Sequence, residues 1–229
     1  MFSIKFSPQF IKSVFIFSTL WCVLLGLSLQ IAKAADGLSS RAEGPHIQVE
    51  LMYEKSAVIP GQSMLLGVLL QPEKDWHTYW QNPGDSGEPP MLNWQVTGVD
   101  IGQDIGQNVG QDIDQRLDEN PPPDWFTFGD ILWPIPKAIP VAHLVNYGYE
   151  GDNLLMVPVT VSSNAQVGDV VNITLDLSWL VCKEDCIPGW ATLGIRLAIA
   201  DSANDTEFTA LFDQAKDYLP SESEAYPAN

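Results

Sequence analysis

The stretch VNITLDLSWLVCKEDCIPGWATLGIRLAI, residues 171–199, decides the fold of this chain. Apolar and polar side chains alternate through residues 171–179, and apolar side chains return at every second position through residues 193–199. A period of two is typical of a β-strand with one buried face. Because the two predicted strands follow each other along the chain, we expect a hairpin, with residues 181–189 as its loop at one tip of the fold.

Short extended segments recur through the preceding part of the chain. Apolar residues alternate with polar ones over 47–51, and aliphatic residues occupy every second position over 155–161. Three further extended stretches are 64–70, 76–80 and 92–96. The 17 prolines and 17 glycines favour many turns and short strands over long helices. We therefore predict an all-β fold, a β-sandwich over residues 46–200.

Residues 201–229 are predicted to form a short C-terminal helix and a tail. Pro220 ends the helix, because proline cannot continue one. Before it, apolar side chains fall at helical spacing, at Phe208, Leu211, Phe212, Ala215 and Leu219. We expect this helix to cap one end of the sandwich.

The N-terminal residues 1–34 have the pattern of a secretory signal peptide. Basic residues precede an apolar run over residues 14–29, and Ala32-Lys33-Ala34 offers a cleavage site with small residues at its two ends. The alternative is an uncleaved anchor, although the run is shorter than the ~20 residues that span a bilayer. We expect cleavage, a polar leader over residues 35–45, and no direct membrane span in the exported chain.

A four-residue unit repeats four times over residues 100–115, beginning with Asp100-Ile101-Gly102-Gln103. A period of four fits neither a strand nor a helix well, and the glycines weaken both. We predict an inserted, mobile surface loop over residues 100–123. A calcium loop is the alternative, but the sequence lacks the Asp-x-Asp-x-Asp-Gly core and the terminal Glu of such a loop.

The charge balance of the chain is strongly acidic. There are 29 acidic and 11 basic residues, which gives a formal net charge of -18 at pH 7. Phosphate backbones and anionic lipids are bound by clustered cations. This balance argues against nucleic acid and against an anionic membrane surface as partners.

Export leaves two of the three cysteines, because Cys22 lies in the predicted signal peptide. In an oxidising compartment Cys182 and Cys186 can pair with each other. Two interpretations of the pair stay open at this point: a structural staple, and a bond that exchanges with other thiols. A disulfide that closes so short a loop restricts the unfolded chain only a little and stabilises the fold by about 2 kcal/mol. A short bridge of this kind is often easily reduced.

Metal binding is a third interpretation of the cysteine pair. Zinc needs two more ligands, and none of His46, His77 and His143 stands at ligand spacing from the cysteines. Two sulfur ligands could hold Cu(I), but we predict no metal site. His77 lies among aromatic residues and is expected to be a hydrogen-bonded structural histidine, with a general base as the alternative. Residues 82–87 are expected to form a turn whose glycines adopt positive φ.

Four motifs occur in a fixed order: WHTYWQNPGDSG (76–87), WPIP (133–136), YGYE (147–150) and WLVCKEDCIPG (179–189). Together they resemble the N-terminal periplasmic domain of DsbD-type protein-disulfide reductases, with the copper-sensitivity suppressor branch, which is ScsB-like, as the nearest match. The resemblance covers about residues 47–219.

This resemblance implies an immunoglobulin-like β-sandwich with a redox hairpin loop and Cys182 and Cys186 as the redox-active disulfide. The domain would take electrons from a membrane-embedded thiol reductase and pass them to periplasmic thioredoxin-fold proteins, with no cofactor besides the disulfide. The family's cap loop, which shields the disulfide until a partner docks, matches in sequence order the residues Tyr147, Gly148, Tyr149 and Glu150. The alternative is that the two tyrosines are ordinary packing aromatics.

Two hypotheses of function follow. The leading one is a periplasmic protein-disulfide reductase, a thiol–disulfide oxidoreductase that relays electrons through Cys182 and Cys186. The rival is a non-catalytic binding or adaptor sandwich, related to copper tolerance, in which the same disulfide is structural.

Overall fold

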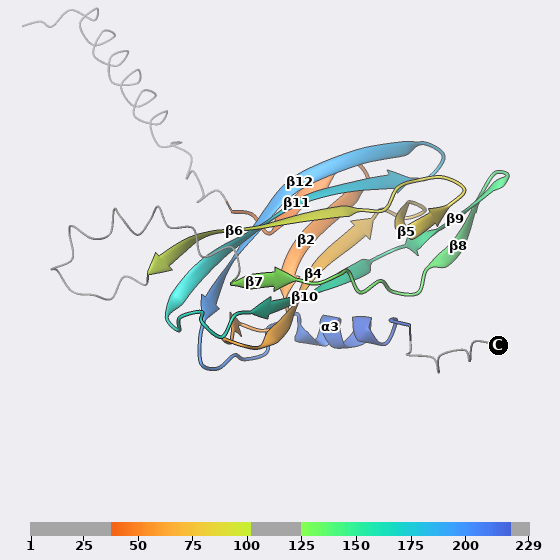
Figure 1. Ribbon diagram of the computed structural model, residues 1–229. Helices are drawn as coiled ribbons and strands as arrows, with labels where there is room; N and C mark the ends of the chain where they lie inside the picture. Colours follow the sequence, from red (N-terminus) through yellow and green to blue (C-terminus); the bar gives the residue numbers. More distant parts are fainter. Residues whose placement is uncertain (1–37, 102–124, 221–229) are drawn as a thin grey trace, which may run out of the picture. The chain divides into compact units, whose positions relative to one another are not determined.

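Two β-sheets face each other across an apolar core in this computed structural model (Figure 1). The structure describes residues 38–101 and 125–220. The five-stranded sheet contains, in order, β1 (Arg41–Gly44), β2 (Ile47–Tyr53), β4 (Ser63–Pro72), β10 (Asn153–Val161) and β7 (Phe126–Phe128). The seven-stranded sheet contains β3 (Ala57–Val58), β12 (Cys186–Ile199), β11 (Asp169–Cys182), β5 (His77–Gly84), β9 (Leu144–Glu150) and β8 (Lys137–Val141), with β6 (Met91–Ile101) also paired to β11.

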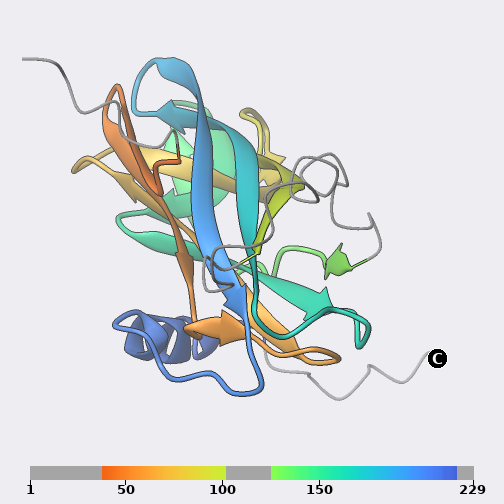
Figure 2. The ribbon, with the colours of Figure 1, turned by 90° about the vertical axis from the view of Figure 1, so that its left-hand side faces the viewer.

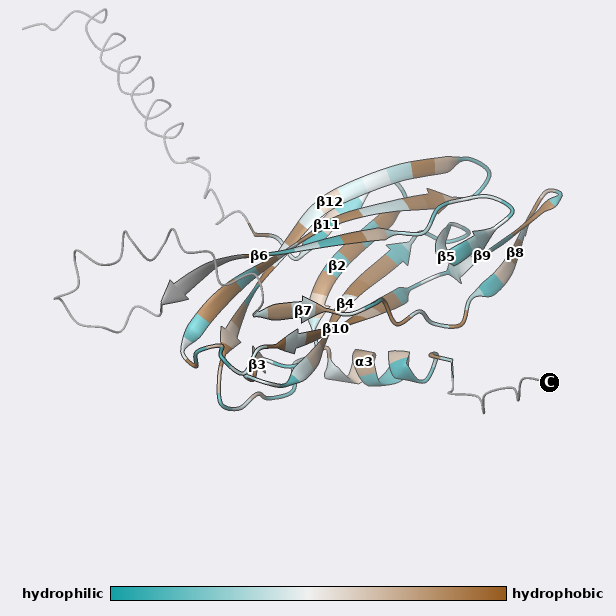
Figure 3. Cartoon of the chain, viewed as in Figure 1, coloured by the Kyte–Doolittle hydropathy of each residue, from teal (hydrophilic) through white to brown (hydrophobic). Residues whose placement is uncertain are grey.

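The core lies between the two sheets, and the alternating residues of β11 form a large part of it. The predicted inward positions are all buried there: Val171, Ile173, Leu175, Leu177 and Trp179. They share one cluster with residues of the other sheet, among them Leu66 and Leu155. Each such side chain contributes about 1.5–3 kcal/mol by leaving water. The predicted all-β sandwich is confirmed, and Figure 3 shows the hydrophobic residues along these strands.

The helix α3 (Thr209–Lys216) covers the outer face of the five-stranded sheet. Phe212 is fully buried in a second apolar cluster, together with Met52, Leu69, Leu154 and Met156. The expectation that this helix caps one end of the sandwich is therefore wrong. The reason is that β10 is apolar on both faces, so its outer face needs cover. Gly67 allows the helix to come close, because a Cβ there would lie 2.8 Å from Phe212 Cζ.

The hairpin of β11 and β12 is longer than the alternation predicts. Its antiparallel register runs without interruption from Val170 opposite Ala198 to Cys182 opposite Cys186. Most of the predicted loop 181–189 is therefore strand, although residues 186–189 carry no alternating pattern. Pairing with a long neighbouring strand outweighs the weak local preference of these residues.

Strand β1 lies within the predicted polar leader, residues 35–45. It pairs with β2, for example through Ala42 opposite Val49, and Ala42 packs against the core. The sandwich therefore begins a few residues before the predicted position 46, because a short polar segment gains stability by pairing with a buried strand.

Several predictions fall on residues that the structure does not describe. These are the signal peptide over residues 1–34, residues 102–123 of the predicted insertion, and the last nine residues of the tail, 221–229. Asp100 and Ile101, the first residues of the predicted insertion, belong to β6. Within residues 38–101 and 125–220, no helix is both long enough and apolar enough to cross a membrane.

Candidate functional site

A disulfide joins the two strands at the tip of the longest hairpin. Cys182 ends β11, Cys186 begins β12, and the two residues are directly opposite in register with Cα atoms 4.2 Å apart. This separation is close to the ~4.5 Å of a non-hydrogen-bonded antiparallel pair, so the ordinary strand geometry brings the sulfurs together. The intervening turn is Lys183, Glu184 and Asp185, and it is hydrophilic and exposed (Figure 3).

The two cysteines differ sharply in exposure. Cys182 is 2% exposed, whereas Cys186 belongs to the exposed face of β12. Along that face every second residue is exposed, namely Cys186, Pro188 and Trp190. Cys186 is therefore the cysteine that presents surface to another protein, whereas Cys182 is covered.

Tyr79 of β5 contacts the exposed cysteine from the interior. Its hydroxyl lies 3.5 Å from Cys186 Sγ, while the tyrosine itself is 1% exposed. Burial raises the pKa of Tyr79 above its usual value of 10.0, because an ionised phenolate would lose its hydration. The hydroxyl therefore stays protonated at neutral and mildly alkaline pH and remains a hydrogen-bond donor.

His77 lies directly beside Cys182, because the two residues pair between β5 and β11. Its ring meets the Tyr79 ring edge to face, with centroids 5.1 Å apart. Burial lowers the pKa of His77 from 6.5, and the charge of Glu150 opposes this change. The imidazole is thus neutral at pH 7. Its Nε2 is buried and has no hydrogen-bond partner among the described residues, so the expected hydrogen bond is missing at this atom.

The loop that follows β5 holds Tyr79 in place. Gly87 lies against the phenol ring so closely that a Cβ at this position would overlap ring atoms. Residues 82–84 of the predicted turn belong to β5, and Gly84 and Gly87 have φ values of 88° and 96°, which confirms the predicted positive φ of these glycines. The loop is fastened to β9, where Asn146 Oδ1 accepts hydrogen bonds from Ser86 N at 3.1 Å and Ser86 Oγ at 3.0 Å.

The predicted cap residues Tyr147, Gly148, Tyr149 and Glu150 lie on strand β9. Glu150 pairs with His77, which in turn pairs with Cys182. With strands ~4.8 Å apart, the Glu150 backbone is about 10 Å from that of Cys182. Tyr147 is exposed, whereas Tyr149 is buried. Shielding of the disulfide by this segment stays a prediction.

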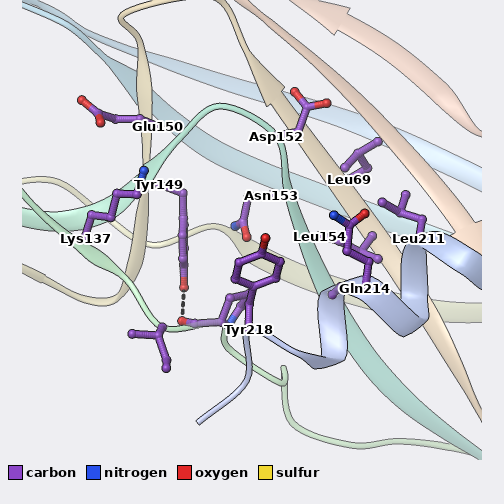
Figure 4. Close-up of a pocket in the computed structure, with 13 residues that line it drawn as sticks. Leu69, Lys137, Tyr149, Glu150, Asp152, Asn153, Leu154, Leu211, Gln214 and Tyr218 are labelled. Atoms are coloured by element: carbon purple, nitrogen blue, oxygen red, sulfur yellow. Dashed lines mark hydrogen bonds between the residues drawn. The ribbon is translucent and has the colours of Figure 1, made fainter.

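Tyr149 belongs to a separate cavity of about 470 Å³ between β9, β10 and α3 (Figure 4). Its hydroxyl donates a hydrogen bond of 2.9 Å to the carbonyl of Pro134. Asn153 and Tyr218 line the same cavity. Figures 1 and 2 show that α3 lies on the opposite side of the molecule from the hairpin tip, while Glu150, which pairs with His77, also lines this cavity.

The charged groups around the disulfide are mainly acidic. Lys183 Nζ lies 3.3 Å from Asp75 Oδ2, in an exposed ion pair that contributes at most about 1 kcal/mol. Glu184 and Asp185 are exposed beside it. In the described part of the chain, no group of three or more His, Cys, Asp and Glu side chains is placed to hold a metal ion.

Sequence reasoning found both cysteines but missed Tyr79. The available signal was the stretch 76–80, in which His77 and Tyr79 occupy alternate positions and so share one face of a strand. That signal does not show which strand lies beside β5.

One family model matches the greater part of this chain. Residues 48–194 match the family model described as thiol:disulfide interchange protein DsbD, N-terminal. No curated protein sequence matches the chain.

The solved structures that match this chain include the following two. One is the N-terminal periplasmic domain of ScsB from Proteus mirabilis, with 21% sequence identity and a TM-score of 0.49. The match covers 80% of this chain and 59% of the ScsB chain, so this chain spans less than two thirds of that relative. The other is AvmM, a protein that catalyses macrocyclization in alchivemycin A biosynthesis. It has 9% identity and a TM-score of 0.24, over 73% of this chain and 98% of that chain.

Proposed function

Because this chain belongs to the family of DsbD N-terminal domains, we propose that Cys182 and Cys186 exchange their disulfide with the thiols of partner redox proteins. The family match over residues 48–194 confirms the resemblance found in the four sequence motifs. The observation that carries the proposal is the geometry of the disulfide, which lies at an exposed hairpin tip with one cysteine exposed and the other buried.

The unequal exposure of the cysteines sets the order of the chemical steps. A partner thiolate attacks Cys186 Sγ and forms a mixed disulfide. The bond to Cys182 breaks, and its electron pair stays on the Cys182 sulfur, which takes up a proton. The second thiolate of the same partner molecule then attacks the partner sulfur of the mixed disulfide. This closes the partner's disulfide and releases Cys186 as a thiolate, which takes up the second proton, so two electrons and two protons have entered the domain.

Delivery of the electrons reverses these steps. The Cys186 thiolate attacks the disulfide of an acceptor, one acceptor sulfur leaves as a thiolate and takes up a proton, and a mixed disulfide forms. Cys182 loses its proton and attacks Cys186 Sγ, which re-forms the internal disulfide and releases the reduced acceptor. The sulfur atoms carry the electrons throughout, so the proposed exchange needs no cofactor besides the disulfide.

A purely structural disulfide at this position would add little to the stability of the fold. The backbone register already aligns β11 and β12 from Val170 to Cys182, so the bond closes a turn that is held by the sheet. In the chain-entropy model, a loop of this size contributes only about 2 kcal/mol. A bond that adds so little stability is better suited to reversible opening.

We place this exchange in the periplasm, between a membrane-embedded thiol reductase as electron donor and thioredoxin-fold proteins as acceptors. The family match and the predicted signal peptide over residues 1–34 support this location and route. The surface that carries Cys186 supports a protein partner, because Trp190, four residues further along β12, is 78% exposed on the same face. Exposed aromatic side chains of this kind commonly dominate the binding energy of protein interfaces.

Redox titration of the purified protein against glutathione tests the exchange. We expect reversible reduction at a potential within the range of exchange proteins, about -120 to -270 mV. A potential below about -300 mV would mark a structural bond and contradict the proposal.

Single-cysteine variants test the order of the steps. Cys182→Ala keeps the exposed Cys186 and should trap a mixed disulfide with a thioredoxin-fold protein. Cys186→Ala keeps only the buried Cys182 and should trap little. Equal trapping by both variants would contradict the assignment of Cys186 as the attacked sulfur, and the double variant is the control for non-specific capture.

A further inference from the structure

We propose that the Tyr79 hydroxyl donates a hydrogen bond to Cys186 Sγ and stabilises the Cys186 thiolate, which makes Tyr79 a catalytic residue of the exchange reaction. The inference rests on the proposed function, since it concerns the same sulfur. It adds a specific donor to the reacting atom.

The contact geometry assigns the direction of this hydrogen bond. The hydroxyl oxygen lies 3.5 Å from Cys186 Sγ, and a sulfur in a disulfide carries no hydrogen, so only Tyr79 can donate. Sulfur is a weak acceptor when neutral, whereas a thiolate is a strong one, because hydrogen bonds to charged groups are roughly twice as strong as neutral ones. The same contact therefore stabilises the reduced protein more than the oxidised one.

The surroundings of the phenol ring make the contact persistent. Tyr79 is almost fully buried, Gly87 is pressed against its ring, and Ser86 fastens the loop to Asn146 of β9. Because the hydroxyl is already held in place, it loses little conformational freedom when the thiolate forms. The entropic cost of ordering the Tyr79 side chain therefore offsets little of the hydrogen-bond energy.

Among the described residues near Cys186, the cation Lys183 is already paired with a carboxylate. Lys183 of the turn pairs with Asp75, and the neighbouring Glu184 and Asp185 disfavour a second negative charge. On the interior side, His77 is neutral and Glu150 of β9 is acidic. Among the described groups that face the disulfide, the Tyr79 hydroxyl is thus the uncharged donor that reaches the reacting sulfur.

The hydroxyl acts in two of the steps. It stabilises Cys186 as the leaving thiolate when the partner's second sulfur resolves the first mixed disulfide. It stabilises Cys186 again as the attacking thiolate when the acceptor is reduced. Tyr79 keeps its proton in both steps, and the electron pairs move between sulfur atoms only.

The test removes the Tyr79 hydroxyl in a protein with one thiol. In the Cys182→Ala background, iodoacetamide alkylation is followed against pH, with and without Tyr79→Phe. The substitution keeps the aromatic ring, so a change reports on the hydroxyl alone. We expect the alkylation midpoint to move up by about one pH unit, with about tenfold slower alkylation below the midpoint.

A second measurement retains both cysteines. Tyr79→Phe is equilibrated with glutathione at a pH above the alkylation midpoint, where the reduced Cys186 is ionised, and we expect the equilibrium to shift toward the disulfide, because the thiolate has lost a stabilising contact. Tyr218→Phe, which removes a hydroxyl from an exposed tyrosine near the end of α3, is the control and should titrate like the wild type.

The outcomes separate this inference from the proposed function. If Tyr79→Phe leaves both the midpoint and the equilibrium unchanged while the wild type exchanges reversibly, the role of Tyr79 is refuted and the exchange function stands. If the wild-type disulfide resists dithiols under native conditions, the exchange function fails and the role of Tyr79 fails with it.

Discussion

Replacing Gly87 by alanine should disturb the disulfide site through the ring of Tyr79. The new Cβ would overlap ring atoms of Tyr79, and φ at this position is 96°, where residues other than glycine are strained. The backbone strain costs roughly 1–2 kcal/mol, and forcing a methyl group into packed surroundings costs roughly 1–3 kcal/mol more. We therefore expect the free energy of unfolding to fall by about 2–5 kcal/mol.

Urea unfolding measures this loss, and the chain offers a matched control. Gly168 has a φ of 102°, but a Cβ added there would meet nothing within 4 Å. Gly168→Ala should therefore show only the backbone strain, roughly 1–2 kcal/mol. The difference between the two variants isolates the overlap with the ring.

The same variants report on the sulfur. Because Gly87→Ala displaces the ring that contacts Cys186, its alkylation rate should change, whereas that of Gly168→Ala should not. Equal destabilisation by the two substitutions would refute the packing of Gly87 against Tyr79. An unchanged alkylation rate in a destabilised Gly87→Ala protein would refute the link from this packing to Cys186.

Three further predictions concern the partner surface, pH and the helix. Trp190→Ser should slow exchange with a thioredoxin-fold protein about tenfold or more but leave reduction by dithiothreitol unchanged, since Trp190 is exposed on the same face of β12 as Cys186. The control is Val167→Ser, which changes an exposed apolar residue just before β11 and should change neither rate. Burial lowers the pKa of His77 below 6.5, so the unfolded chain binds the proton more readily than the folded one. The stability contributed by neutral His77 should be fully present above about pH 6.5 and be lost as the pH falls through the folded pKa. A His77→Gln variant whose free energy of unfolding, measured with urea, falls equally steeply with pH would contradict this. Phe212→Ala should lower the free energy of unfolding by about 3–5 kcal/mol, because Phe212 of α3 is fully buried against the five-stranded sheet. The redox potential should stay unchanged, and a shifted potential would show coupling between this cluster and the hairpin tip.

The strand pattern was predictable because alternation is a local property. Val171 to Trp179 alternate strictly in the sequence, and the structure buries every second one of them in the core. The short strand β1 was missed because its sequence, Arg41 to Gly44, carries no alternation that stands out from a polar leader. Such a segment becomes a strand only because β2 offers it a pairing edge.

The position of α3 shows a similar limit. Helical spacing identified Phe212 and its neighbours as one apolar face, but spacing does not say what that face packs against. The outer face of β10 accepts it, with Leu154 and Met156 in contact with the buried phenylalanine. A sequence pattern that is apolar on both faces of β10 was the available signal.

The sequence by itself determined the two long strands, the hairpin that joins them, and the placement of both cysteines near its tip, because each of these depends on residues close together in the chain. Only the tertiary structure decided that β5 lies beside Cys182, that Cys182 is buried while Cys186 is exposed, and that Tyr79 reaches the exposed sulfur. These features depend on pairings between segments about 100 residues apart, and hydrophobic periodicity carries no information about which distant strands become neighbours.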